Sequence, residues 1–126
     1  MPAKPVLLSI IELGGYPDFT RLYEASGFEV VIADSVRKAV KLIRKHKPDV
    51  MVAEFNFQSD FRDRTSSLET LLSSTQGVTD ASMIVFYEKD FEVHYQRFLQ
   101  DVEVAASLTF PIDEQRLSDV LADISR

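Results

Sequence analysis

The stretch Pro48-Asp49-Val50-Met51-Val52-Ala53-Glu54 decides the fold of this chain. Its four apolar residues follow a proline that stops the preceding helical pattern, and an unbroken apolar run of this kind is typical of a strand covered on both faces. The run ends at a carboxylate, Glu54. In an open parallel sheet, ligands bind beyond the carboxyl ends of the strands. The stretch therefore predicts a central strand and makes Glu54 a candidate functional residue.

Apolar runs and amphipathic segments alternate along the rest of the chain. Strands are predicted at residues 6–11, 28–33, up to about 55, 82–87 and 102–109. Five helices are predicted: from Pro17 to Gly27, from Asp34 or Ser35 to Pro48, from Ser66 to Gly77, over 91–100, and from Asp113 onward. Such alternation implies parallel βαβ units in one doubly wound sheet. We therefore expect a single α/β domain over residues 1–126, with the flavodoxin-like strand order 2-1-3-4-5.

Composition narrows the classes of function. The chain has 126 residues, 45% of them hydrophobic, which suits one globular domain. No apolar run approaches the roughly 18 residues of a membrane span, and no signal peptide is recognised. The absence of cysteine excludes disulfides and thiolate sites, so we expect a cytoplasmic protein. The net charge of −6 argues against general binding to nucleic acid, because phosphate contacts need a basic surface.

The order of the elements resembles that of bacterial receiver domains, the CheY-like domains of two-component response regulators. Further points of resemblance are Gly27-Phe28-Glu29-Val30, the spacing from Pro48 to Glu54, and Leu108-Thr109-Phe110-Pro111. The resemblance covers essentially the whole chain and implies a role in signal transduction. In that family two acids after the first strand hold magnesium, and an Asp after the third strand accepts a phosphoryl group. A Ser or Thr after the fourth strand and a Lys after the fifth contact that group, and the cations neutralise charge on its oxygens.

This chain departs from the family pattern at each of these positions. The acid pair, the acceptor Asp, the hydroxyl and the Lys are replaced by Ile10 and Ile11, Glu54, Tyr87 and Phe110. Only Glu12 lies close to the position of the acid pair. Pro111 is kept, and an aromatic residue before proline favours a cis bond. The resemblance thus implies a pseudo-receiver with a degenerate phosphorylation site at Glu12, Glu54, Tyr87 and Phe110, and with no catalytic residue, cofactor or metal.

Glu54 has three interpretations. It is a fixed mimic of a phosphorylated aspartate, a residual metal ligand beside Glu12, or a solvated carboxylate at the end of a strand. The first interpretation is limited by charge, because a carboxylate carries one negative charge where a phosphate carries nearly two.

Three segments are candidates for protein interaction. The second helix concentrates basic residues without an acid among them, namely Arg37, Lys38, Lys41, Arg44 and Lys45. This face is either simply solvated or docks an acidic partner, which includes a second copy of the chain. Residues 88–101 match the helix that forms part of the output face of receivers, and His94 and Arg97 are expected to face solvent there. Phe57 and Phe61 follow the third strand, and aromatic residues are enriched at binding hot spots.

Two functions are carried forward. The first is an interaction module that works without phosphorylation and binds a signalling protein or a second copy of itself. The alternative is a sensor of a small ligand or anion at the strand ends near Gly14, Gly15 and Glu54, since backbone N–H groups at a helix start bind anions. An enzyme is not predicted, because no nucleophile–base pair, metal cluster or phosphate loop is present.

Overall fold

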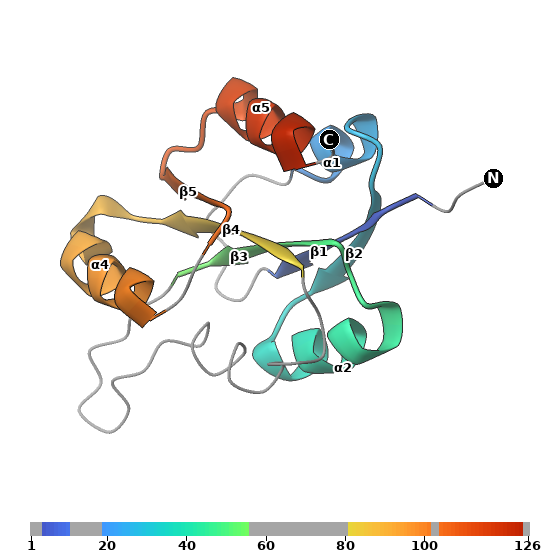
Figure 1. The fold of residues 1–126 in the computed structure, drawn as a ribbon, viewed down its shortest axis with the longest axis horizontal. Coiled ribbons are helices and arrows are strands. Elements are labelled where there is room, and N and C mark those ends of the chain that lie inside the picture. The colour runs from blue at the N-terminus through green and yellow to red at the C-terminus, as the bar shows by residue number, and fades with distance from the viewer. Residues whose placement is uncertain (1–3, 11–18, 56–80, 102–103, 125–126) are drawn as a thin grey trace.

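A five-stranded, all-parallel sheet organises the chain (Figure 1). The computed structural model describes residues 4–10, 19–55, 81–101 and 104–124. The strands are β1 (Val6–Ile10), β2 (Glu29–Ala33), β3 (Val50–Glu54), β4 (Ser82–Tyr87) and β5 (Ala106–Thr109). Their order across the sheet is β2-β1-β3-β4-β5. The predicted fold class and strand order are confirmed.

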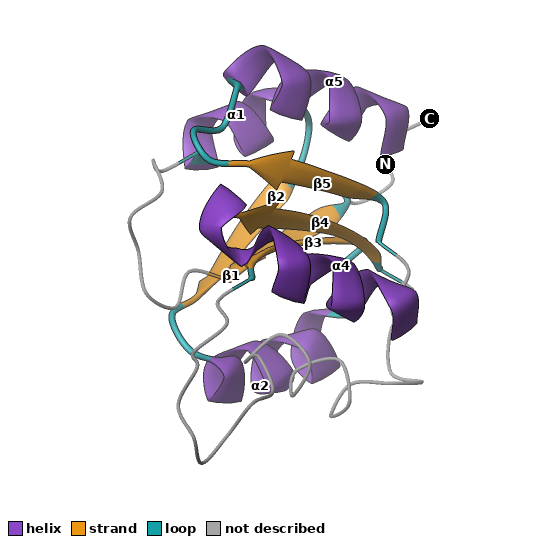
Figure 2. Ribbon diagram, turned by 90° about the vertical axis from the view of Figure 1, so that its left-hand side faces the viewer, coloured by secondary structure: helices purple, strands orange, loops and turns teal. Residues whose placement is uncertain are grey.

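Helices cover both faces of the sheet. They are α1 (Thr20–Ala25), α2 (Val36–His46), α4 (Glu92–Asp101), which follows the 3-10 turn η1 (Lys89–Phe91), and α5 (Glu114–Ile124). Helices α1 and α5 lie on one face, and α2 and α4 lie on the other (Figure 2). The helix predicted from Ser66 to Gly77 lies outside the described residues.

Each face of the sheet has its own apolar core, since successive strand residues point to opposite faces. The core under α2 and α4 includes Leu8, Ala39, Ile43, Met51, Val85, Tyr95 and Phe98. The core under α1 and α5 includes Leu7, Tyr23, Val50, Ile84, Phe86, Leu117 and Leu121. Residues 50–53 of β3 alternate between the two cores, which explains why the sequence shows an unbroken apolar run there.

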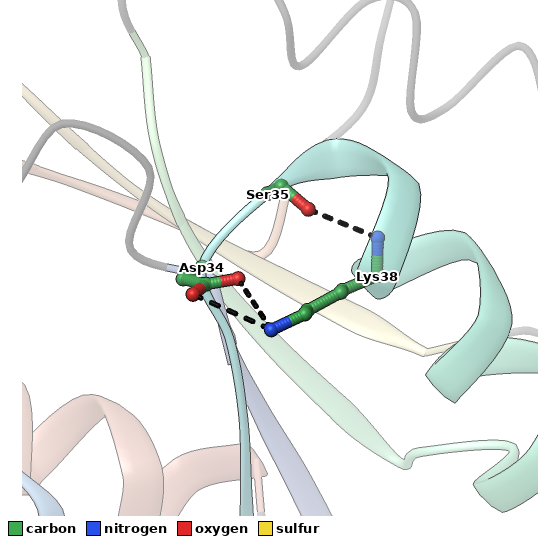
Figure 3. A network of polar contacts seen from close by, with 3 residues as sticks. All are labelled: Asp34, Ser35 and Lys38. Carbon is green, nitrogen blue, oxygen red and sulfur yellow. Dashed lines mark hydrogen bonds and ion pairs between the residues drawn. The ribbon is translucent and has the colours of Figure 1, made fainter.

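Local signals set most of the helix ends. Ser35 caps α2, because its Oγ accepts a hydrogen bond from the Lys38 backbone N–H at 3.1 Å (Figure 3). Lys47 ends this helix in the left-handed conformation, directly before Pro48. Gly27 adopts a φ of 97° after α1, a conformation that glycine tolerates best. Asp113 Oδ1 accepts from the backbone N–H groups of Gln115 and Arg116 at the start of α5.

Two predicted boundaries are wrong. Helix α1 begins at Thr20 rather than at Pro17, because Phe19 is its N-cap residue and its buried ring packs edge-on against Phe86. Strand β5 begins at Ala106 rather than at residue 102, since its register pairs Ala106 with Ile84 of β4 and leaves only four residues before the turn. Apolar character alone did not mark where the pairing starts.

Candidate functional site

Three of the four predicted site residues lie at the carboxyl ends of neighbouring strands. Glu54 ends β3, Tyr87 ends β4, and Phe110 directly follows β5. These strands are neighbours, and the Phe110 backbone N–H donates to the Tyr87 carbonyl oxygen at 2.9 Å. The fourth residue, Glu12, lies outside the described residues. The three residues therefore lie at the end of the sheet where parallel α/β proteins bind their ligands, although the side chains of Glu54 and Tyr87 point to opposite faces.

Glu54 is buried. Only 7% of the residue is exposed, and both carboxylate oxygens are shielded from solvent. By strand alternation it lies on the same face of β3 as Val52, and its register partner on β4 is Phe86. The interpretation of Glu54 as a solvated carboxylate is therefore wrong. The physical reason is that Glu54 belongs to the central strand β3, which lies between β1 and β4.

An aromatic cluster fills the other face at the same edge. It consists of Phe55, Tyr87, Tyr95 and Phe98. The Tyr87 and Tyr95 rings stack with their centroids 4.2 Å apart and an interplanar angle of 22°. Phe55 meets Tyr95 edge-on at 5.1 Å. The cluster joins α4 to the carboxyl ends of β3 and β4, so the ring of Tyr87 packs in the core under α4.

A hydroxyl contact adds β5 to this assembly. Tyr95 is fully buried, and its hydroxyl hydrogen-bonds the hydroxyl of Ser107. One side chain of α4 thus contacts residues that belong to or follow three consecutive strands. Nothing in the sequence predicted this pair, because a serine within a short strand is not informative by itself.

The two tyrosines have altered acidity. Burial raises the pKa of Tyr87, and the nearby Glu92 carboxylate raises it further. Burial also raises the pKa of Tyr95, against the opposing effect of the Ser107 hydrogen bond. Both phenols are therefore neutral at physiological pH and suited to packing and hydrogen bonding.

Phe110 presents an apolar ring to solvent. It is 43% exposed, and its bond to Pro111 is cis, as the sequence predicted. Val93 of α4 is another exposed apolar residue, at 66%. The exposed side chain at this strand end is a phenyl ring, which carries no charge.

The basic residues of α2 all face solvent: Arg37, Lys38, Lys41, Arg44 and Lys45 are exposed. Lys38 forms an ion pair with Asp34 at 3.2 Å (Figure 3). On α4, Arg97 is exposed as predicted, whereas His94 is only half-exposed, because its position on the helix lies nearer the sheet. Phe57, Phe61, Gly14 and Gly15 lie outside the described residues.

Two further features concern ligands and membranes. Among the described side chains, no three His, Asp or Glu residues are grouped closely enough to hold a metal ion. Within the same residues, no helix has the length and apolarity needed to cross a membrane.

Solved structures resemble this chain over nearly its whole length. The signal receiver domain of an HD domain-containing protein from Pseudomonas fluorescens superposes with a TM-score of 0.75 at 15% identity, over 98% of this chain and 95% of that one. The receiver domain of a two-component response regulator from Bacteroides fragilis gives 0.73 at 16% identity, over 97% and 98%. The chain has the receiver fold.

A third solved structure is somewhat more similar in sequence than these two. The receiver domain of the response regulator AraT from Geobacillus stearothermophilus is 22% identical, with a TM-score of 0.65 over 94% of this chain and 92% of that one. No protein-family model matches the sequence, and no curated protein sequence matches it either. At such identities the likeness establishes the fold, and function must be argued from the site.

Proposed function

We propose that this chain is a receiver-like protein-interaction module of bacterial signal transduction that works without phosphoryl transfer. The signalling role is supported by the neighbouring structures, which are described as signal receiver domains and response regulators. Independence from phosphorylation is supported by the replaced residues at the carboxyl ends of the strands.

The buried carboxylate of Glu54 carries the proposal. Phosphorylation of a carboxylate requires an oxygen that a phosphate donor can approach in line, together with cations that neutralise the transferred group. Both oxygens of Glu54 are shielded from solvent, and the side chain at the lysine position is the phenyl ring of Phe110. Burial of Glu54 hinders the approach of a donor, and Phe110 contributes no neutralising charge, and both observations support the proposal.

The aromatic cluster supports a fixed surface in place of a switched one. Tyr95 is fully buried, stacked on Tyr87 and hydrogen-bonded to Ser107. Interiors of this density resist small displacements, since any shift loses close contacts. Helix α4 is held to the sheet by these contacts without a phosphate, so its outer surface, which includes Val93 and Arg97, stays constant.

Amide NMR spectra test this proposal. They are recorded for the protein alone, with magnesium, and with magnesium plus beryllofluoride, which mimics an acyl phosphate. We expect no change at the resonances of Glu54, Tyr87 and Phe110, and no labelling by acetyl phosphate. Saturable shifts at these residues that disappear in Glu54→Gln would show a working site and overturn the proposal.

A further inference from the structure

Helix α2 concentrates positive charge on one narrow face. At about 100° per residue, Arg37, Lys38, Lys41, Arg44 and Lys45 fall within an arc of roughly 120°, and all five are exposed. On the opposite side of the helix, Ala39 and Ile43 are completely buried in the core. We call the five basic residues the cationic face. It extends about 12 Å along the helix, at 1.5 Å per residue.

The helix does not balance this charge itself. Residues 36–47 hold six of the chain's 14 basic residues and none of its 20 acidic ones. Within the described part of the chain, the cationic face has one ion pair, between Lys38 and Asp34, which precedes the helix (Figure 3). Like charges at i,i+4, such as Arg37 with Lys41, lower helix stability by a few tenths of a kcal/mol per pair.

A gain in helix stability explains the presence of only some of the basic residues on the cationic face. Arg44 and Lys45 lie in the last turn, where cations interact favourably with the helix dipole. Arg37 lies in the first turn, where a cation is unfavourable and the sequence has no acidic residue. Arg37 and Lys41 therefore lower the stability of α2. Residues that lower stability in this way are expected where the charge has a role in binding.

The surroundings select the kind of ligand. A helix that lies on a membrane needs an exposed apolar face, and the apolar stripe of α2 is already buried against the sheet. A long polyanion such as duplex DNA extends past the helix and meets a chain whose net charge is −6. A short acidic peptide segment contacts the cationic face alone and avoids that repulsion.

We propose that the cationic face of α2 docks an acidic segment of a partner protein. This inference rests on the proposed function and names the chemistry of its partner. Arg37, Lys41 and Arg44 are spaced at i, i+4 and i+7, so a partner helix with carboxylates at the same spacing matches them one to one. The docking is electrostatic, and it weakens as salt screens exposed charges.

The test uses a double variant and a control of equal charge. The variant is Arg37→Glu with Lys41→Glu, and the control is Lys4→Glu with Lys89→Glu, both exposed and both outside α2. The probe is a fluorescein-labelled oligoglutamate peptide about as long as α2, titrated by fluorescence anisotropy at low and moderate salt. A duplex DNA oligonucleotide and vesicles containing anionic lipid are titrated in parallel, and sedimentation is measured for the chain alone.

The proposal expects the peptide to bind the wild-type chain and the control with similar affinity. It expects at least about tenfold weaker binding to the Arg37→Glu, Lys41→Glu variant. That variant should melt no lower than the wild type. Lys41→Glu places an acid at attractive spacing from Arg44 and Lys45. Arg37→Glu places one in the first helical turn, and these gains offset the like-charge pair that stays between positions 37 and 41. Loss of binding then cannot be attributed to unfolding.

Four results overturn the proposal: no peptide binding, equal loss in the variant and the control, tighter α2-dependent binding of DNA or vesicles, or self-association that depends on Arg37 and Lys41. The last result assigns the face to a second copy of the chain. Beryllofluoride spectra of the same samples separate the two proposals. A failed titration with unchanged spectra removes only the docking inference, whereas shifted spectra remove the proposed function.

Discussion

Removing the hydroxyl of Tyr95 should loosen the contact between α4 and β5 without emptying the core. Tyr95→Phe keeps the ring that packs against Phe55, Tyr87 and Phe98, and deletes only the hydrogen bond to Ser107. The matching change on β5 is Ser107→Ala. Together with the double variant, these make a double-mutant cycle for the contact.

The magnitude follows from burial. A net intramolecular hydrogen bond contributes about 1 kcal/mol, and leaving a buried partner unsatisfied costs about 1–3 kcal/mol. Ser107 is only half-buried, so water replaces part of what it loses. We expect Tyr95→Phe to lower the free energy of unfolding by about 1 kcal/mol, or the melting temperature by roughly 3–5 °C for a chain of this size. Tyr95→Ala removes the ring as well and should cost about 4 kcal/mol.

Urea unfolding monitored by circular dichroism measures all three variants of the cycle, and hydrogen exchange of α4 and β5 amides locates the change. The coupling energy between Tyr95 and Ser107 should be about 1 kcal/mol. If the two single changes add within about 0.3 kcal/mol, the hydroxyl pair does not stabilise the fold and the reasoning fails. If Tyr95→Ala costs no more than Tyr95→Phe, the packing of the ring does not stabilise the fold, and that part of the reasoning fails.

Three further predictions concern the cap, the pH dependence and the site. Ser35→Ala should cost about 1 kcal/mol of unfolding free energy, since it deletes the hydrogen bond to the Lys38 N–H, while Ser35→Asp retains a cap; thermal melts compare them. Burial raises the pKa of Tyr87 and Tyr95. The contribution of these two protonated phenols to the free energy of unfolding is therefore intact below pH 10 and is lost above it. Above pH 10 the unfolded chain releases protons that the folded chain retains, so the free energy of unfolding falls by up to about 1.4 kcal/mol per pH unit per tyrosine. The slope of unfolding free energy against pH should be smaller in Tyr87→Phe. An unchanged slope would contradict the raised pKa of Tyr87. Glu54→Asp should remain unlabelled by acetyl phosphate, because the ring of Phe110 still occupies the lysine position, and labelling of this variant would show that the lysine is dispensable.

Local sequence signals determined the architecture. The alternation of apolar runs with amphipathic segments predicted the parallel sheet and its strand order, and Ser35, Gly27 and Asp113 marked helix ends. These features depend on residues a few positions apart, so the spacing along the chain contains them. The sequence also predicted that Glu54, Tyr87 and Phe110 lie at the carboxyl ends of neighbouring strands, because these ends share one side of a parallel sheet.

Only the tertiary structure decided how these residues are used. The sequence left Glu54 as a mimic, a ligand or a solvated group, and its burial depends on strands and helices from distant parts of the chain. The stacking of Tyr87 on Tyr95 and the contact of Tyr95 with Ser107 require α4 to cross the sheet at one particular place. The start of α1 likewise depended on Phe19 reaching Phe86. Periodicity assigns a residue to a face, whereas its contacts across that face depend on how the elements pack.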